Sequence, residues 1–452
     1  MAASGKSATP DVRQAAASSA QEGSWLYQQL RPDSAAANLC LGFRVDGPLQ
    51  LAALRAAWLA VLQRHEVLRT NLVEVDGRPL QQILPVTGAG LRLLDLTGAA
   101  AGEAELWCAK WARRPFQLAH DPLAWLYILR LEPQRHLVLL IAHRAVADER
   151  SMSILVRDLS SGYASAVIDG TARVAAAELP VRYCDYVGRQ RPPAHQRGVD
   201  WWTATLSHRV RAAPPAGPGR PRAVSERAGR LGFRWGAELG RELGRFCLAT
   251  GHPPAAVLSA GCQAVLPRHG RRRQLEVGIR VAGRCHPDLA NLVGPLDDLV
   301  VIGTEPTGRR SFAELVAATD RGRRQAIQER SSSLGRWERA LGADREPGSL
   351  ALCDVVIAVA DGPPAGLSIS DAAVHRFEIH SGALSSDLAL RVDRLDTVSG
   401  TLGYRTDLLD PAGAAGLLDR LRSLLSAGLR EPAARLDELS AREVPAPGSF
   451  AG

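Results

Sequence analysis

Apolar residues along the chain fall into short runs and periodic stretches that predict alternating strands and helices. A continuous apolar run at 137–142 is typical of a buried strand. A polar cluster follows it, and an apolar pattern at helical spacing begins at Ile154. Folds commonly place chemistry in a turn between a strand and a helix, because the turn exposes side chains at the edge of a rigid sheet. Residues 143–151, which contain this turn, are therefore the candidate site.

The remaining elements are predicted in the same way. Helical periodicity and helix-opening residues predict helices at 49–63, 103–113, 237–249, 254–267, 311–329 and 410–429, with short helices around 183–186 and 200–202. Apolar runs bounded by turn residues predict strands at 39–45, 81–84, 125–131, 275–279, 352–359 and 385–392. The sequence contains no internal repeat at a fixed period.

Composition narrows the class of protein. At 452 residues the chain is long enough for two domains, each with its own hydrophobic core. The net charge of +8 is carried almost wholly by arginine, since lysine occurs only at Lys6 and Lys110. A basic balance fits acidic partners. The sequence shows no interleaving of aromatic and basic residues, no zinc-ligand spacing and no basic helix, so nucleic acid is not expected as a partner.

Cysteine usage and the lack of long apolar segments predict a soluble, cytoplasmic protein that makes no contact with a membrane. The seven cysteines are scattered singly without a Cys-x-x-Cys pair, which favours free thiols in a reducing compartment. Residues 1–18 lack the apolar core of a signal peptide. No run of about 18 apolar residues occurs that could span a membrane. The Ala-rich start and the short tail favour a free-standing chain.

Seven stretches, in this order and spacing, resemble the condensation domains of nonribosomal peptide synthetases, and the agreement extends from about residue 19 to 430. They are residues 19–21, 64–70, 143–151, 183–186 with 201–202, 277–284, 291–299 and 387–388. None of them is decisive alone. Their order along the chain makes the resemblance strong.

This resemblance implies an α/β fold of two chloramphenicol acetyltransferase-like lobes, arranged in a V with a central tunnel. In that family, carrier proteins bring thioesters to the middle on phosphopantetheine arms, and an amine on the acceptor attacks the donor thioester. The implied partner is a peptidyl or acyl carrier protein, with no cofactor or metal bound by the chain itself. The expected parts are a disordered N-terminus at 1–18, an N-terminal lobe at 19–175, a C-terminal lobe at 176–440 with a loop at 209–229, and a loose tail at 441–452.

The core motif of the family, His-His-x-x-x-Asp-Gly, is altered here at two positions. Residues 143–149 are His-Arg-Ala-Val-Ala-Asp-Glu, so Arg144 replaces the His usually assigned to catalysis and Glu149 replaces the Gly. A His can take and return a proton near neutral pH. An arginine, with a pKa above about 12, stays charged and only donates hydrogen bonds. Arg144 could instead stabilise an oxyanion, or anchor a carboxylate or phosphate.

Two other motif residues, which join Arg144 as candidate catalytic residues, have more than one interpretation. His143 either acts as the base through a one-residue shift of the turn or points into its lobe and holds the turn, as the family's first His does. A strand alternates faces, so a one-residue shift would turn the side chain away, which favours the second interpretation. Glu149 either fills the room that Gly leaves beside the substrate, supplies a new general base, or lies on the solvated surface.

The remaining motif residues are expected to be structural. The resemblance implies that Asp148 forms an ion pair across the lobe interface. Its candidate partner is Arg284, with Arg280 second, and pairing with Arg144 is a local alternative. Ser151 is expected to cap the following helix.

Residues outside the motif offer weaker candidates. Ser385 and Ser386, near the tunnel wall of the second lobe, either contact substrate or end a strand together with Asp387. His65 and Arg69 lie in a stretch whose role in the family is mainly structural.

Two classes of function remain open. The first is an enzyme that performs an altered acyl transfer, forming an amide or ester on carrier-bound substrates. The second is a binding platform. An Arg in place of the second His, with an acidic residue after the Asp, resembles the X domains of glycopeptide synthetases, whose motif is His-Arg-x-x-x-Asp-Asp. The resemblance implies that such domains do not condense but recruit tailoring oxygenases to a carrier-bound peptide.

Overall fold

The structure is a computed structural model, and it describes residues 12–174, 178–189, 225–266, 275–329, 353–360, 362 and 365–441. These residues divide into two compact units. The first takes the described residues of Met1–Pro193, Ala282–Asp297 and Pro364–Ala383, and the second those of Ala194–Val281, Asp298–Pro363 and Leu384–Gly452. A single break near residue 175 would assign three described segments to the second lobe that belong to the first unit, namely 178–189, 282–297 and 365–383.

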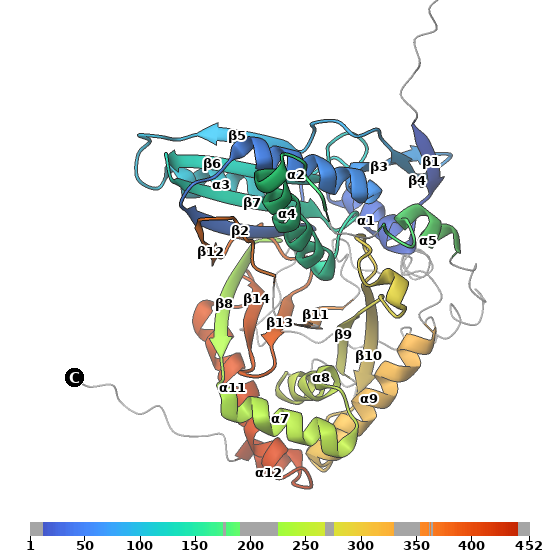
Figure 1. Cartoon of the computed structure of the whole chain (residues 1–452). Helices are drawn as coiled ribbons and strands as arrows, with labels where there is room; N and C mark the ends of the chain where they lie inside the picture. Colours follow the sequence, from blue (N-terminus) through green and yellow to red (C-terminus); the bar gives the residue numbers. More distant parts are fainter. Residues whose placement is uncertain are drawn as a thin grey trace, which may run out of the picture. The chain divides into compact units, whose positions relative to one another are not determined.

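A five-stranded sheet forms the centre of the first unit (Figure 1). Its strands, in spatial order, are β12 (Ala373–Phe377), β2 (Asn38–Asp46), β7 (Arg135–His143), β6 (Ala124–Glu132) and β5 (Leu91–Asp95). After its first residue, β7 is buried throughout, as expected for a central strand covered on both faces. This apolar run, which the sequence identified, places the candidate site at the end of the middle strand.

Helices cover this sheet through their apolar sides. They are α2 (Leu51–Arg64), α3 (Glu103–Ala112) and α4 (Glu149–Asp169). Trp111 of α3 stacks on Tyr127 of β6 with ring centroids 4.2 Å apart, which fixes α3 against the sheet. Helices α2 and α4 pack against each other, and Gly162 allows that approach, since a Cβ there would lie 3.2 Å from the Cβ of Ala57.

The N-terminal part of the first unit contains a small three-stranded sheet. Its order is β1 (Arg13–Ala16), β4 (Arg78–Ile83) and β3 (Thr70–Val75). Residues 13–16 thus form a strand where the sequence suggested disorder, because four residues are too few to show a period. Ser18 then caps α1 (Ser19–Leu30), and Gln21 returns a hydrogen bond to the backbone of Ser18, completing a capping box. The 3-10 helix η1 (Glu66–Arg69) and helix α5 (Tyr183–Arg189) complete this region.

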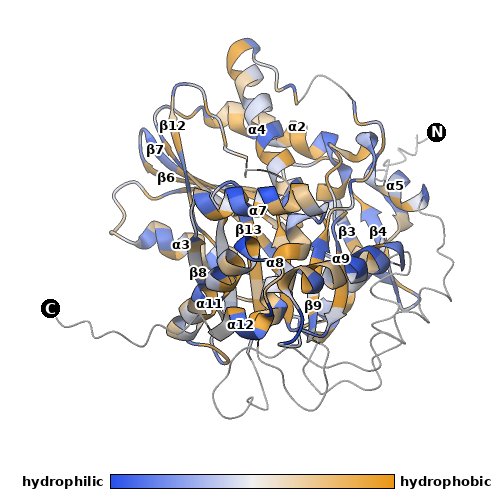
Figure 2. Cartoon of the chain, turned by 90° about the horizontal axis from the view of Figure 1, so that it is seen from below, coloured by the Kyte–Doolittle hydropathy of each residue, from blue (hydrophilic) through white to orange (hydrophobic). Residues whose placement is uncertain are grey.

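The second unit is built around a six-stranded mixed sheet. Its strands, in spatial order, are β10 (Asp298–Thr304), β9 (Leu275–Val281), β11 (Val355–Val359), β13 (Leu388–Arg394), β14 (Ser399–Arg405) and β8 (Ala228–Arg234). Its helices are α7 (Ala237–Thr250), α8 (Pro254–Val265), α9 (Phe312–Gln328), α11 (Pro411–Arg430) and α12 (Leu436–Ala441). Figure 2 shows hydrophilic and hydrophobic residues alternating along α7 and α9, as expected for helices that bury one face.

Of the remaining predicted segments, some are present in the structure and some lie outside the described residues. The predicted helix at 410–429 is α11, and the Oδ1 atom of its N-cap Asp410 accepts a hydrogen bond from the Gly413 amide at 2.7 Å. The short helix at 200–202, the tail from 442 and residues 209–224 of the expected loop lie outside the described residues. The rest of that loop is described, and β8 begins within it at Ala228.

Two further features concern the whole described chain. All seven cysteines lie within it, and each carries a free thiol. In the described ranges, none of the helices combines the length and the apolar character that crossing a membrane requires.

Candidate functional site

The candidate site is a tight turn that joins β7 to α4. The amides of Val146 and Ala147 both donate to the carbonyl of His143, at 3.0 and 3.2 Å, which reverses the chain directly after the strand. Residues 145–147 are fully buried, so the turn is anchored in the hydrophobic core of the first unit. Of the motif residues, only Arg144 and Glu149 keep substantial exposure.

His143 lies in the core. Its Nδ1 atom accepts a hydrogen bond from the Ala145 amide at 3.1 Å, and its ring meets the edge of Phe116 at a centroid distance of 5.7 Å. Burial, assisted by the charge of Arg144, lowers the pKa of His143 to about 3. The imidazole is therefore neutral at physiological pH, and its acceptor nitrogen is used within the turn. This geometry matches a residue that holds the turn, and not a shifted base.

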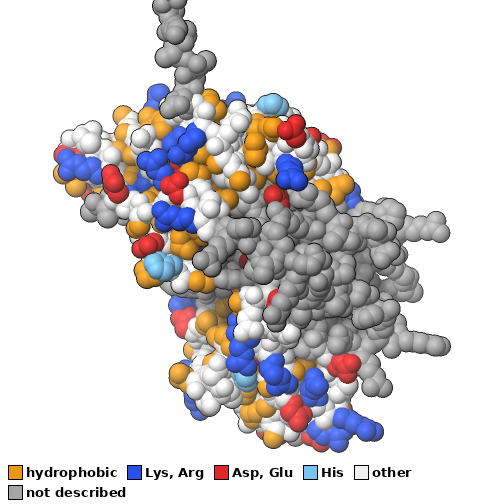
Figure 3. Space-filling view, turned by 90° about the vertical axis from the view of Figure 1, so that its right-hand side faces the viewer, with side chains coloured by type: hydrophobic (Ala, Val, Ile, Leu, Met, Phe, Trp, Pro, Cys, Tyr) orange, Lys and Arg blue, Asp and Glu red, His pale blue; other side chains and the backbone are white. Residues whose placement is uncertain are grey.

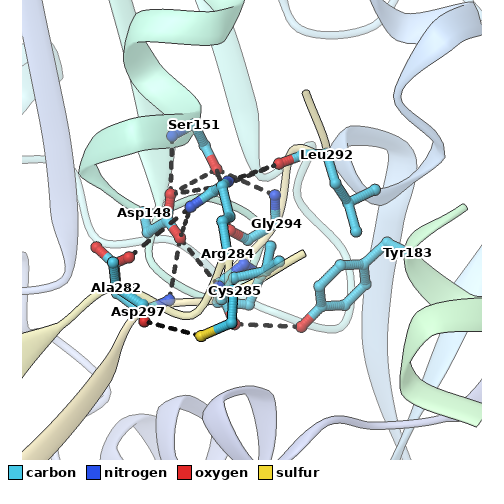
Figure 4. Close-up of polar contacts among 11 residues, drawn as sticks. Asp148, Ser151, Tyr183, Ala282, Arg284, Cys285, Leu292, Gly294 and Asp297 are labelled. Atoms are coloured by element: carbon cyan, nitrogen blue, oxygen red, sulfur yellow. Dashed lines mark hydrogen bonds and ion pairs between the residues drawn. The ribbon is translucent and has the colours of Figure 1, made fainter. Parts of the chain in front are cut away.

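Asp148 is the N-cap of α4 and the centre of a buried polar cluster (Figure 4). Its Oδ1 accepts from the Ser151 amide and hydroxyl, both at 2.7 Å, and from Arg284 Nη2 at 2.9 Å. Its Oδ2 accepts from Arg284 Nη1 at 2.8 Å and from the amides of Leu296 and Asp297 at 3.0 and 3.1 Å. A carboxylate offers about four lone-pair sites, so these donors occupy the whole group and leave it unsuited to take a substrate proton.

Arg284 is the partner of Asp148, and this contact lies within the first unit. Its side chain is only 7% exposed, and it also donates to the carbonyl of Leu292 from Nε at 3.2 Å and from Nη2 at 2.9 Å. The sequence also offered Arg280 and Arg144 as partners. Arg280 lies on β9 in the second unit, and Arg144 pairs elsewhere.

Ser151 does not cap α4 as the sequence suggested. The helix begins at Glu149, so Asp148 takes the cap position and the Ser151 amide is the donor that it satisfies. Besides its contact with Asp148, the Ser151 hydroxyl oxygen accepts from the Gly294 amide at 3.0 Å and lies 2.9 Å from the Gly294 carbonyl. Ser151 therefore joins α4 to the 282–297 segment.

Gly294 brings Tyr183 into the framework of the site. Its φ of +155° disfavours other residues, and a Cβ there would lie 2.2 Å from the Tyr183 ring. The Tyr183 hydroxyl donates to Ser18 Oγ at 2.8 Å, which connects the start of α1 to this segment. Figure 4 shows the ring beside the cluster. The Gly-Pro pair at 294–295 was the sequence signal that could have pointed to this contact, whereas no sequence signal marks the backbone donors of Leu296 and Asp297.

Arg144 and Glu149 form a second ion pair at the same turn. Arg144 Nη2 lies 2.9 Å from Glu149 Oε1, with side chains 26% and 30% exposed. Glu149 is the first residue of α4, where a negative charge is favoured by the helix dipole. The substitutions of the family's second His and of its Gly have thus produced a charge pair. Each of the two charged side chains is therefore ion-paired.

The candidates in the second unit have local partners. The buried Ser386 donates its hydroxyl to the carbonyl of Leu388 at 3.0 Å, and Arg405 Nη2 donates to the carbonyl of Ser385 at 2.9 Å. Asp387 is buried and lies 3.6 Å from Arg405 Nη1. These contacts support the interpretation of a strand end with a satisfied Asp.

His65 and Arg69 also have structural partners. His65 Nε2 lies 2.8 Å from Oδ2 of the buried Asp158, and Arg69 donates to the carbonyls of Leu62 and Leu84. Within the described part of the chain, no group of three or more His, Cys, Asp or Glu residues is arranged to hold a metal ion.

The two mixed α/β units and the His-Arg-x-x-x-Asp-Glu turn define a protein with the chloramphenicol acetyltransferase-like fold. The chain belongs to the condensation-domain family of nonribosomal peptide synthesis, since the family model described as "Condensation domain" matches residues 12–443. The phosphinothricin tripeptide synthetase PhsB of Streptomyces viridochromogenes is 33% identical over 92% of this chain. The probable non-canonical nonribosomal peptide synthetase CymA of Salinispora arenicola is 30% identical over 95%. The chain spans 37% and 6% of these relatives.

Solved structures agree with the fold. The X-domain from teicoplanin biosynthesis has a TM-score of 0.78 and 25% identity, covering 93% of this chain and 96% of that one. The first condensation domain of the calcium-dependent antibiotic synthetase (CDA synthetase) has a TM-score of 0.75 and 24% identity, covering 94% and 98%. The chain is therefore similar in structure both to a domain named for condensation and to an X-domain.

Proposed function

We propose that this protein is a binding platform of nonribosomal peptide biosynthesis, which holds a carrier-bound acyl or peptidyl thioester without condensing it. The observation that carries the proposal is the commitment of every motif side chain. His143 is buried and uses its acceptor nitrogen within the turn, Asp148 is saturated by six contacts, and Arg144 is paired with Glu149.

The physical argument concerns proton transfer. An amine that attacks a thioester must lose a proton, and a group at the reaction centre accelerates this step only if it can accept one near neutral pH. Arg144 cannot accept a proton, and burial makes His143 a poor acceptor. Glu149 is a carboxylate, but its Oε1 atom already accepts from the Arg144 guanidinium at 2.9 Å, so it is engaged within the turn.

The partners follow from the family. A peptidyl or acyl carrier protein would present its thioester on a phosphopantetheine arm, which is the partner's own group. A tailoring oxygenase is the second partner that we propose, since an X-domain of this fold has been solved in complex with a protein named OxyB.

A second candidate function is favoured by the position of Arg144. Its guanidinium is held by Glu149 and lies beside the end of the central strand, and about a quarter of the side chain is exposed to solvent. Such a cation could stabilise the oxyanion of a thioester under attack, so that an acceptor whose amine is already neutral reacts without a protein base.

The test is a pair of measurements with one donor carrier loaded with an aminoacyl thioester and one loaded acceptor carrier. The platform requires that the native chain bind a loaded carrier while forming no product above the carriers alone. Product that disappears in Arg144→Met would overturn the platform and favour the oxyanion function. A native chain that neither binds nor reacts would contradict both functions.

A further inference from the structure

Three arginines and a buried carboxylate lie near one another at the N-terminal edge of the first unit, and one of the arginines, Arg13, pairs with the carboxylate. Arg13 comes from β1, Glu66 and Arg69 come from η1, and Arg182 directly precedes α5. We call these four residues the arginine patch. The edge that bears β1, β4 and α5 lies at the upper right of Figure 1, and Figure 3 shows basic side chains close together on the upper part of this face.

Glu66 organises the patch. Its side chain is 7% exposed and pairs with Arg13, and its Oε1 accepts the Cys184 amide at 3.3 Å. Arg13 also reaches the sulfur of Cys184 at 3.1 Å from Nη2. The guanidinium of Arg13, whose side chain is 44% exposed, is therefore held in place by contacts to two other elements. A fixed guanidinium loses little conformational entropy when a partner binds it.

The arginines of the patch outnumber its carboxylate. Arg69 is anchored by the carbonyls of Leu62 and Leu84, and Arg182 is exposed. The pKa of Arg69 is lowered first by burial and also by the charges of Arg13 and Arg182, and Glu66 opposes the decrease. Asp185, exposed on α5, is an acidic neighbour, and its Oδ1 lies 3.5 Å from the Cys184 sulfur. The arginines thus repel one another, and one buried Glu cannot neutralise them all.

The patch is connected to the candidate site through α5. Tyr183, the first residue of this helix, lies against Gly294 and binds Ser18, and the next residue, Cys184, contacts both Arg13 and Glu66. A partner bound at the patch would therefore rest on the same framework of side chains that holds the 282–297 segment on Asp148.

We propose that the arginine patch is a docking surface for the acidic face of a carrier protein, with Arg13 and Arg182 as the contacting residues. This inference rests on the proposed function, because that function requires a carrier. Charge complementarity supports it, since a basic surface attracts an acidic partner and accelerates its association. Arg69 supplies positive charge behind the surface, because its side chain is engaged by backbone carbonyls.

The experiment measures the affinity of the full chain for a holo carrier-protein domain of net negative charge, taken from a nonribosomal peptide synthetase. The double variant Arg13→Gln/Arg182→Glu should bind roughly tenfold more weakly at low salt, with a flatter dependence on salt concentration. Arg182→Glu alone should lose part of this affinity, and it leaves the Arg13–Glu66 pair intact. The matched control is Arg241→Gln/Arg245→Glu, which makes the same charge change on the exposed face of α7 in the second unit.

The outcomes separate the two proposals. Weaker binding by the patch variants, with unchanged binding by the control, supports the docking surface. Equal binding by all variants overturns it and leaves the platform standing. No carrier binding by the native chain overturns the platform, and the docking surface with it. If double-stranded DNA binds with the same dependence on Arg13 and Arg182, the patch attracts any polyanion and the assignment to a carrier fails.

Discussion

Two arginine–carboxylate pairs lie at the same turn and differ in almost every physical respect. Asp148 and Arg284 are buried, and further donors to the carboxylate come from Ser151 of α4 and from the amides of Leu296 and Asp297. Arg144 and Glu149 are about one quarter to one third exposed and lie five residues apart along the chain. The first pair joins α4 to the 282–297 segment. The second occupies the positions where the family carries chemistry, and it depends much less on the fold.

The largest expected effect comes from breaking the buried pair. Arg284→Met leaves the Asp148 carboxylate buried without its counter-charge, which should lower the free energy of unfolding by about 3–5 kcal/mol. Urea denaturation measures this loss. The control Asp46→Asn breaks the surface pairs that Asp46 makes with Arg44 and Arg135 and should cost less than about 1 kcal/mol. A loss of less than 1 kcal/mol in Arg284→Met would show that the cluster does not hold the turn.

A smaller loss is expected when the 282–297 segment is displaced. Gly294→Ala places a Cβ at 2.2 Å from the Tyr183 ring on a backbone with φ of +155°, so either the ring or the segment must move. We expect a cost of about 2 kcal/mol or more, measured as the change in free energy of unfolding. Gly188→Ala on α5 is the matched control, since its Cβ would meet open space, and its stability should be unchanged or higher. Equal stability of the two variants would contradict the contact.

The buried His143 should make the free energy of unfolding depend on pH. Its pKa is about 3 in the folded state and 6.5 without burial, so between these values the unfolded chain binds a proton that the native chain does not. Stability should therefore fall as pH decreases from about 6.5 towards 3, by up to about 1.4 kcal/mol per pH unit from this group. His143→Asn, whose side-chain oxygen can still accept from the Ala145 amide, should flatten the slope. The control His375→Asn changes an exposed residue of β12 and should leave the slope of stability against pH unchanged. An unchanged slope in His143→Asn would show that His143 is protonated in the folded state.

The smallest effect is expected for the exposed pair. Arg144→Met and Glu149→Gln should each change the free energy of unfolding by less than about 1 kcal/mol, because water screens a partly exposed ion pair. A double-mutant cycle should give a coupling energy of similar size. A coupling of several kcal/mol would mean that the pair is part of the framework, as Asp148 and Arg284 are.

The sequence identified the turn between a strand and a helix and one of its contacts, but not the others. The apolar run of β7, the following polar turn and the helix after it were visible because burial on both faces and helical periodicity leave patterns in the residues. The family motif also gave Arg284 as the partner of Asp148. The pairing of Arg144 with Glu149 was not predicted, because it depends on how the turn brings the end of β7 to the first residue of α4.

Other parts of the fold left no clear pattern in the sequence. Strand β12 joins the edge of the first unit's sheet through backbone hydrogen bonds to β2, and its five residues are mostly exposed or half-buried, so no apolar period marks it. The amides of Leu296 and Asp297 bind Asp148 through the backbone, which any residue provides. Capping residues, in contrast, have side chains that reveal them, as Asp410 shows at the start of α11.

The central claim is that each motif side chain that could accept a proton from the attacking amine is already engaged within the turn. The most direct measurement is the rate of amide formation from loaded donor and acceptor carriers, compared between the native chain and Arg144→His/Glu149→Gly, which restores the family motif. The account predicts no product above background from the native chain, although it binds the loaded carrier, and measurable product from the restored variant. Amide formation by the native chain that Arg144→Met or Glu149→Gln abolishes would contradict it.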